Sequence, residues 1–435
     1  MPRPRAPRHP HLHVPPPRLL PFLMACLTFI VAGHSPQSEA ETLVDAAAEP
    51  FAYDPAIIDT WTLEEQVGQL LVWGSTQLPA DVEVILAGSE AEGRPPIPIG
   101  GVLMTSKKDR KPTDVQAVAE FLRATELAPV PPLLCADQEG GKVAALREGV
   151  RVAPSHFALG GFGEADIRTA ARDMAEDTRA AGIDVILGPV LDVDGEPFNP
   201  AIGAKERSFS SDPLVVAQAG LAFTQGLLDG GIIPVLKHFP GHGTPQDDSH
   251  LGLPAVEAPI EEWEATEQIP YRFVFEELPL RRATNPVVGV MIAHLDWPAL
   301  TNDEGPTCFS PTLVKVHLRE RYGLQDAVVV SDDLLMKAIK DPVEGAVQMR
   351  KAGIDLLLVS SQRSIIAAVH KALVKYYRNG WLNQRDLRAS LERILRMKSA
   401  IANNWAPLGP DAEPPALPET LAPAPQPSLP PEGIF

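Results

Sequence analysis

The chain has 435 residues, with 38 Lys or Arg against 56 Asp or Glu and a formal net charge of −18. So acidic a chain lacks the basic surface that nucleic-acid binding needs, which argues against a nucleic-acid partner. Three Cys residues exclude a disulfide framework and a Cys-rich zinc module, and 45% hydrophobic residues exclude a collagenous or disordered chain. The length allows one large α/β barrel with tails, or two to three average domains.

The first 40 residues are typical of an export signal. Four arginines within residues 1–18 precede the apolar run 19–33, after which small and polar residues follow. Fifteen apolar residues are fewer than the ~20 that span a bilayer, so we expect a cleaved signal peptide over residues 1–40 and a periplasmic or secreted chain. An uncleaved anchor is one alternative, and lipid anchoring is another because residues 23–26 resemble a lipoprotein cleavage box.

Segments on both sides of the globular part are expected to lie outside the barrel domain. We expect an N-terminal linker over residues 41–60, one domain over residues 61–404 and a Pro-rich disordered tail over residues 405–435. Ten prolines fall in the 31 residues of this tail, so it is short of backbone donors and apolar mass. A polyproline segment that binds a partner is the alternative.

Short β-rich runs alternate with stretches of helical periodicity through the middle of the chain. The strand candidates are continuous apolar runs, as expected of parallel strands covered on both faces: Gln69–Gly74, Gly101–Thr105, Leu133–Asp137, Val185–Asp192, Val235–Phe239, Gly289–His294, Ala327–Asp332 and Asp355–Ser360. The helix candidates, several of which end on glycine, are Val115–Glu126, Ile167–Gly182, Leu214–Gly230, Glu261–Leu278, Thr312–Tyr322, Val343–Gly353, Ser364–Gly380 and Gln384–Ala402.

Eight such units over about 340 residues predict an α/β fold, a single (β/α)8 TIM-type barrel. The alternative, an open doubly wound sheet, normally has a Gly-rich phosphate loop after its first strand, and this chain has Gly74-Ser-Thr-Gln there. A barrel places its chemistry at the carboxyl ends of its strands. Five predicted strands end on polar groups, namely Asp137, Asp192, Lys237-His238, His294 and Asp332. We therefore expect a site at this face, although Asp192 by itself fits a solvated strand end.

Asp332 follows the apolar run 327–330 and is expected to enter the barrel mouth partly desolvated. Such a carboxylate acts as a nucleophile toward an electrophilic carbon or as an electrostatic anchor. The next residue, Asp333, fits the N-cap of a helix starting at Leu334.

The segment 237–250 carries Lys237, three histidines and two acids on an irregular loop with two glycines and two prolines. Asp248 and His250 lie two residues apart, so the carboxylate can hydrogen-bond the imidazole and form a proton shuttle near neutral pH. A metal site of three histidines and Asp248 is the rival interpretation. It is disfavoured because Lys237 would repel a cation and the spacing matches no common zinc pattern.

Four further side chains suit the binding of a neutral polyol. Arg207, Lys237 and His238 supply hydrogen-bond donors, and Asp137 supplies an acceptor. Hydroxyl geometry is read by such donor and acceptor sets. Phosphate is disfavoured as the ligand because several acids share the predicted mouth.

Six segments, in order, resemble the motif series of family 3 glycoside hydrolases, in particular the single-domain bacterial β-N-acetylglucosaminidase (β-N-acetylhexosaminidase) branch that acts on peptidoglycan fragments. They are Asp137-Gln-Glu-Gly-Gly, Glu206-Arg-Ser-Phe, Lys237-His-Phe-Pro-Gly-His-Gly, Asp248-Ser-His, Met291-Ile-Ala-His294 and Ser331-Asp-Asp-Leu. The resemblance runs from about residue 61 to residue 398. It implies that Asp332 is the nucleophile, His250 the acid/base and Asp248 its partner. It also implies that Asp137, Arg207, Lys237 and His238 bind the sugar at the non-reducing end.

The resemblance therefore implies an exported, retaining exo-β-N-acetylglucosaminidase for peptidoglycan- or chitin-derived oligosaccharides, working through two displacements. We expect an amino-sugar oligosaccharide as substrate, no cofactor, no metal, no membrane span in the mature chain, and a monomer. A related β-glycosidase, a glycoside phosphorylase and a non-catalytic envelope sugar-binding protein are the alternatives.

Two positions depart from the family pattern. Thr244-Pro245 stands where the family usually has Asp, and Lys142 and Ala145 stand where it has two arginines. We expect the sugar contacts at this corner to differ, and Arg147 is the one candidate nearby for a replacement donor, which the sequence alone does not test.

Overall fold

The computed structural model describes residues 53–75, 79–89, 93–105, 110–195, 199–245, 249–278 and 287–404. The predicted signal peptide, most of the predicted linker and the Pro-rich tail lie outside the described residues. Those expectations stay predictions, whereas residues 55–60 of the predicted linker form a 3₁₀ helix whose Ile58 is buried in the core.

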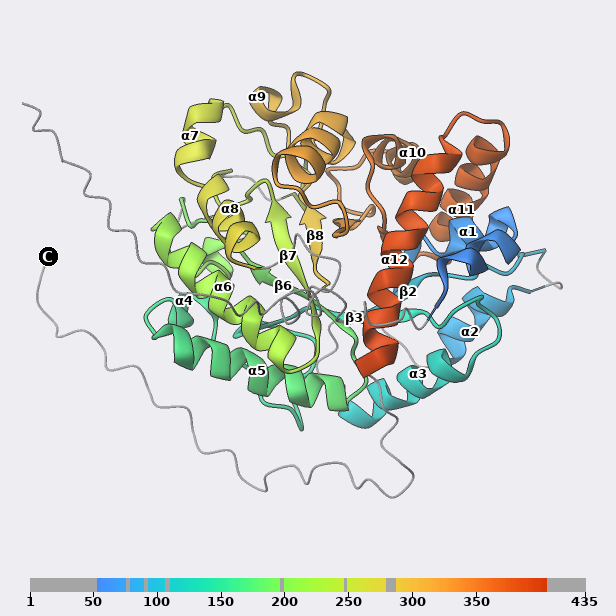
Figure 1. Cartoon of the computed structure of the whole chain (residues 1–435), viewed down its shortest axis with the longest axis horizontal. Coiled ribbons are helices and arrows are strands. Elements are labelled where there is room, and N and C mark those ends of the chain that lie inside the picture. Colours follow the sequence, from blue (N-terminus) through green and yellow to red (C-terminus); the bar gives the residue numbers. More distant parts are fainter. Residues whose placement is uncertain are drawn as a thin grey trace, which may run out of the picture. The chain divides into compact units, whose positions relative to one another are not determined.

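Eight parallel strands, each followed by helical segments, form the core of the described chain (Figure 1). The strands are β1 (Leu71–Ser75), β2 (Gly101–Met104), β3 (Leu133–Ala136), β6 (Val185–Val190), β7 (Ile233–Phe239), β8 (Gly289–Ile292), β9 (Val328–Ser331) and β10 (Leu357–Ser360). All eight predicted strands are thus confirmed, with ends that differ by a few residues. A hairpin of β4 (Gln138–Gly140) and β5 (Val143–Ala144) follows β3.

The sheet order β10-β1-β2-β3-β6-β7-β8-β9 closes on itself and confirms the predicted barrel. A parallel bridge between Val330 and Leu356 joins the last two strands, and the Ser331 amide donates to the Leu356 carbonyl at 2.9 Å. Buried apolar side chains fill the strands, as in Val328–Ser331, where every residue is buried. Each such side chain contributes about 1.5–3 kcal/mol on burial, so continuous apolar runs are what a sheet covered on both faces requires.

Helices surround the barrel. The long ones are α3 (Pro112–Ala124), α5 (Glu164–Ala180), α6 (Pro213–Asp229), α8 (Gln268–Glu277), α10 (Pro342–Ala352), α11 (Arg363–Arg378) and α12 (Gln384–Asn404), with the π-helix η5 (Thr312–Arg321). Shorter ones are η1 (Pro55–Thr60), α1 (Leu63–Gly68), α2 (Pro79–Ala87), α4 (His156–Leu159), η3 (Gly203–Lys205), α7 (Ile260–Ala265), α9 (Pro298–Thr301) and η4 (Thr307–Phe309). None of the helices in the described ranges is both long and apolar enough to cross a bilayer.

The predicted helix Glu261–Leu278 is wrong as a single element, because the chain breaks between α7 and α8. Thr266 leaves helical geometry, with φ −129° and ψ −94°. The break brings Glu267 into the protein, where its carboxylate accepts hydrogen bonds from backbone amides of two loops.

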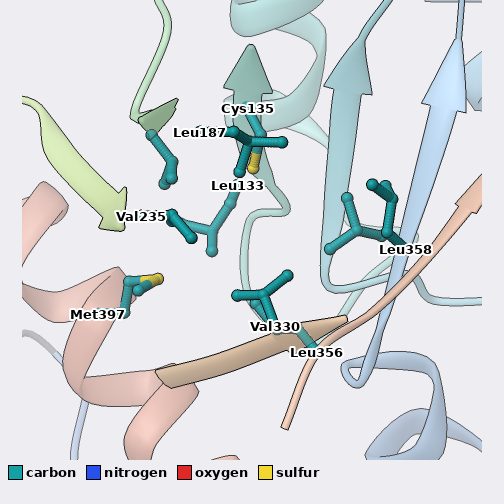
Figure 2. A pocket seen from close by; sticks show the side chains of 10 residues that line it. Leu133, Cys135, Leu187, Val235, Val330, Leu356, Leu358 and Met397 are labelled. Atoms are coloured by element: carbon teal, nitrogen blue, oxygen red, sulfur yellow. The ribbon is translucent and has the colours of Figure 1, made fainter. Parts of the chain in front are cut away.

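The barrel interior is packed with apolar side chains. A small cavity of about 20 Å³ remains, lined by residues that include Leu133, Cys135, Leu187 and Val235 from the strands and Met397 from α12 (Figure 2). It has room for about one water but offers almost no polar partner for it. Leu187 also borders the polar pocket described below, so an apolar layer separates that pocket from the other end of the barrel.

Candidate active site

A polar pocket of about 200 Å³ lies at the carboxyl ends of the strands. It is lined by Asp137, Glu139, Val143, Leu187, Lys205, Arg207, Lys237, His238, His250, Met291, Asp332 and Leu358. Six of the seven predicted site residues therefore border one pocket. The seventh, Asp248, lies outside the described residues.

Glu139, which sequence reasoning missed, is the centre of the pocket's ion-pair network. Its carboxylate accepts two hydrogen bonds from the Arg207 guanidinium, at 2.8 and 2.7 Å, and lies 2.7 Å from the Lys237 ammonium. Burial by itself raises the pKa of Glu139, but the charges of Arg207 and Lys237 outweigh burial and hold that pKa far below its usual value. Glu139 therefore stays ionised and fixes both cations. It lies inside the Asp137-Gln-Glu motif, which was the available signal.

Lys237 also donates to Asp137 at 2.7 Å, and its side chain is only 2% exposed while that of Asp137 is 34% exposed. Burial lowers the pKa of Lys237, yet the charges of Asp137 and Glu139 more than compensate and raise it overall. The ammonium is thus a fixed cation at the pocket wall, and Asp137 is the partner that reaches toward solvent.

Asp192 is not the solvated strand end that we expected. It is fully buried, and it accepts hydrogen bonds from His238 Nδ1 at 2.7 Å and from the backbone amides of His238 and His242 at 3.0 and 2.9 Å. Burial raises the pKa of Asp192, but His238 outweighs burial and lowers it. The strand end turns inward because these donors come from the neighbouring β7 and from the loop that follows it, a feature that the local sequence does not reveal.

The hydrogen-bond partners of His238 define its tautomer. Because Nδ1 faces the Asp192 carboxylate, Nδ1 carries the proton, and Nε2 accepts from the Arg207 guanidinium at 3.2 Å. A chain of hydrogen bonds thus runs from Arg207 through His238 to Asp192 and orients the imidazole at the pocket.

Asp332 follows β9, and one of its carboxylate oxygens accepts the Asp333 amide at 2.8 Å. Burial raises its pKa, but the neighbouring histidines His294 and His238, the Asp333 amide and Lys237 together lower it below its ordinary value. The carboxylate is therefore ionised at neutral pH and available in the pocket. The expected helix cap at Asp333 is wrong: its side chain accepts from the Leu335 and Ser360 amides, and the next helix begins at Pro342.

His250 borders the pocket from the long loop after β7, and its side chain is exposed. Its neighbour Ser249 is buried, with its hydroxyl 2.9 Å from His242 Nε2. The loop therefore carries an exposed imidazole next to a buried attachment point. An ionised carboxylate and an imidazole that border the same pocket can serve a nucleophilic attack and a proton transfer on one substrate.

The corner that departs from the family pattern has other contacts. Lys142 pairs with Glu206 at 2.7 Å on the surface, and Ala145 is buried. Arg147 donates to the carbonyls of Gly141 and Lys142 and does not line the pocket, so the candidate replacement for a sugar-binding arginine is not confirmed. Lys205, which sequence reasoning missed, lines the pocket instead.

His156 contacts the backbone of Arg207. Its Nδ1 lies 2.8 Å from the Arg207 carbonyl and its ring stacks on Phe209 at 4.2 Å between centroids. Burial lowers the pKa of His156 to about 4, so the ring is neutral at neutral pH. It positions the segment 206–209 without adding charge.

The sequence of this chain is similar to one family of known proteins. The model of the glycosyl hydrolase family 3 N-terminal domain matches residues 62–397. Beta-hexosaminidase LpqI of Mycobacterium tuberculosis is 31% identical over 410 residues, covering 88% of this chain and 97% of that protein. The Beta-hexosaminidase of Methylococcus capsulatus is 34% identical over 282 residues, covering 63% of this chain and 79% of that protein.

Solved structures share the architecture. The M. tuberculosis LpqI structure has a TM-score of 0.69 and 32% identity, covering 80% of this chain and 96% of that one. A family 3 beta-N-acetylglucosaminidase from Paenibacillus sp. has a TM-score of 0.71 and 32% identity, covering 79% of this chain and 64% of that one. This chain therefore spans a little under two thirds of the Paenibacillus chain.

Proposed function

Because the chain belongs to glycosyl hydrolase family 3, we propose that it is an exported, retaining exo-β-N-acetylglucosaminidase. The family and the relatives named Beta-hexosaminidase make it a glycoside hydrolase of the β-N-acetylhexosaminidase type. The proposal adds the catalytic residues, the retention of configuration, the natural substrate and the export.

The observation that carries the proposal is that Asp332 and His250 border one pocket. Asp332 attacks the anomeric carbon while His250, assisted by Asp248, protonates the departing oxygen; His250 then deprotonates the water that releases the sugar from Asp332. Arg207, Lys237, His238 and Asp137 bind the sugar hydroxyls. Two contacts support these binding roles. Glu139 fixes the positions of Arg207 and Lys237, and the hydrogen bond to Asp192 orients the imidazole of His238.

The apolar layer behind the pocket forms its floor. Leu187 and Leu358 border both the pocket and the apolar cavity behind it. A packed floor of this kind is general for barrels, so the exo action in the proposal rests on the family and on the named relatives, and the terminal N-acetylglucosamine is proposed to occupy the pocket.

Lys205 favours a peptidoglycan fragment over a chitin fragment. It is half-buried at the pocket wall, and among the residues that the structure describes no carboxylate pairs with it. Arg207 and Lys237, in contrast, are engaged with Glu139 and Asp137. An ammonium that has no carboxylate partner within the described ranges attracts the lactyl carboxylate of a muramic-acid residue in the leaving group, whereas a chitin fragment presents only neutral groups.

One set of assays tests the reaction. Aryl β-glycosides of N-acetylglucosamine, glucose and xylose are supplied to the purified mature chain, and the anomeric configuration of the first product is followed by NMR. We expect cleavage of the N-acetylglucosaminide with retention and no dependence on phosphate. A rate that requires phosphate would identify a phosphorylase, and binding of N-acetylglucosamine without release of product would identify a sugar-binding protein.

A second set tests the leaving group. We expect a disaccharide with a muramic-acid leaving group to be cleaved about tenfold faster than N,N′-diacetylchitobiose, since one charge-assisted contact contributes about 1.5 kcal/mol or more. Lys205→Met or methyl esterification of the carboxylate should remove the difference. An unchanged preference in Lys205→Met would contradict this role of the lysine.

A further inference from the structure

A buried acidic side chain outside the pocket contacts the loop that carries His250. Glu267, between α7 and α8, is 1% exposed, and no motif drew attention to it. Its carboxylate accepts four hydrogen bonds from neutral donors: the Val193 amide at 2.9 Å on one oxygen, and the Gly243 amide at 2.9 Å, the Thr244 amide at 3.1 Å and the Thr244 hydroxyl at 3.1 Å on the other. One side chain thus joins the loop after β6 to the loop after β7.

Two glycines let the loop approach this carboxylate. A Cβ on Gly241 would lie 2.5 Å from the Glu267 carboxyl carbon, and a Cβ on Gly243 would lie 1.6 Å from the Val193 carbonyl oxygen. Both distances are far below van der Waals contact, so only glycine fits at either position. The two glycines of the Gly-His-Gly sequence therefore allow the backbone to lie directly against Glu267.

The start of the loop is held from other sides as well. Asn199 donates to the carbonyls of His242 and Pro245 at 2.9 and 2.6 Å, and Asp192 accepts the His242 amide. The segment from His242 to Pro245 is thereby fixed on the barrel.

That segment in turn holds the residue next to the imidazole. His242 Nε2 lies 2.9 Å from the Ser249 hydroxyl, and the Ser249 carbonyl accepts the Ala338 amide at 3.3 Å. The imidazole of His242 is buried and burial lowers its pKa to about 4, so it is neutral in this contact at neutral pH. Glu267 therefore supports both the start of the loop and, through His242, the attachment point of His250.

We propose that Glu267 is a positioning residue that sets the base of the loop so that His250 reaches the leaving-group oxygen. This inference rests on the proposed function, in which His250 is the acid/base. Glu267 itself does not line the substrate pocket, so we expect its largest effect on the steps that need the proton of His250.

The test uses Glu267→Gln with two aryl N-acetyl-β-glucosaminides. Burial and the charge of Asp192 raise the pKa of Glu267 to about 8, but its four donors require the ionised form. That form accepts hydrogen bonds on both oxygens, whereas the amide nitrogen of Gln cannot, so in either orientation Gln turns an N–H toward a backbone N–H. A 2,4-dinitrophenyl leaving group departs without a proton, and a phenyl leaving group needs one. We expect kcat/KM of Glu267→Gln to fall about tenfold more for the phenyl substrate than for the dinitrophenyl substrate.

Two reference variants make the test specific. Asp184→Asn alters another buried carboxylate that accepts a backbone amide, from Leu134 at 2.8 Å, at the opposite end of the barrel. It should change both substrates by the same factor. His250→Ala should show the same selectivity as Glu267→Gln, with a loss of roughly a hundredfold or more on the phenyl substrate, the usual contribution of an acid catalyst.

The outcomes separate the two levels of the proposal. If His250→Ala loses equally on both substrates, the acid/base assignment fails and the role of Glu267 fails with it. If His250→Ala is selective and Glu267→Gln is not, only the role of Glu267 is overturned. Should Glu267→Gln not fold, Thr244→Val removes one of the four donors and must show the same selectivity to a smaller degree; equal losses in that variant overturn the proposal.

Discussion

The two ends of the barrel bury the same kind of ion pair and use it differently. At one end, Glu139 holds Arg207 and Lys237 at the wall of an open pocket. At the other end, Asp355 is fully buried, lies 2.7 Å from Arg319 and is bound by Arg393 of α12.

The difference lies in what remains for a ligand. Both oxygens of Asp355 are occupied by protein donors, which include the Ser390 hydroxyl at 2.7 Å and the Val329 amide at 2.9 Å. Beside Glu139, in contrast, Asp137 and Asp332 border a pocket. A buried ion pair therefore marks a site only where unused acceptors and donors beside it face a cavity.

The largest effect is expected from the nucleophile. Asp332→Asn replaces a carboxylate that attacks carbon with an amide that does not, so turnover of an aryl N-acetyl-β-glucosaminide should fall about ten thousandfold or more. Initial rates measure the loss, and thermal unfolding shows whether the fold survives. A variant that turns over at the wild-type rate would contradict the assignment.

The next largest effect is expected from Asp355, at the opposite end of the barrel from the pocket. Asp355→Asn leaves Arg319 and Arg393 without their carboxylate, and loss of one partner from a buried ion pair costs about 3–5 kcal/mol. Urea unfolding should show this loss, while KM of the remaining folded enzyme stays unchanged. A changed KM with unchanged stability would reverse the comparison between the two ends.

An acid-stability experiment sharpens the role of His156. Its pKa is about 4 in the folded chain because of burial, against about 6.5 when unfolded. The unfolded chain therefore takes up this proton first, so the contribution is complete above pH 6.5 and is lost as the pH falls toward 4, by about 1.4 kcal/mol per pH unit. Stability of the wild type should fall more steeply with acid than that of His156→Gln over this range. Parallel curves for the two proteins would count against a buried neutral imidazole.

The smallest effect is expected from a surface pair. Lys142 and Glu206 are 55% and 43% exposed, so solvent screens them although they lie 2.7 Å apart. Lys142→Ala should change the free energy of unfolding by less than about 1 kcal/mol. A loss comparable to that of Asp355→Asn would mean that exposure does not separate the two kinds of pair.

Much of the fold was predictable because apolar runs and helical periodicity are local. All eight strands and most long helices follow from those patterns, and the barrel follows from their order. The short helices α1 and α2 and the hairpin β4–β5 were missed, since a few residues carry too little periodic signal. The single helix predicted over Glu261–Leu278 failed because tertiary hydrogen bonds of Glu267 outweigh helical propensity.

The candidate site divides in the same way. Asp332, Lys237 and Asp137 were predictable as polar groups at strand ends, because parallel strands bring those ends to one face. Asp192 was misjudged, since its partners lie 46 and 50 residues further along the chain. The candidate donor Arg147 does not line the pocket, because its side chain donates to the nearby carbonyls of Gly141 and Lys142.

The sequence by itself determined the alternation of strands and helices, the face on which polar groups gather and, through its motifs, the family. Only the tertiary structure decided which acidic and basic side chains border the pocket. It also decided which ones, such as Asp192 and Glu267, are buried and hold neighbouring segments by hydrogen bonds. The physical reason is that a strand end fixes the position of a side chain, whereas its role depends on donors that other segments bring within about 3 Å.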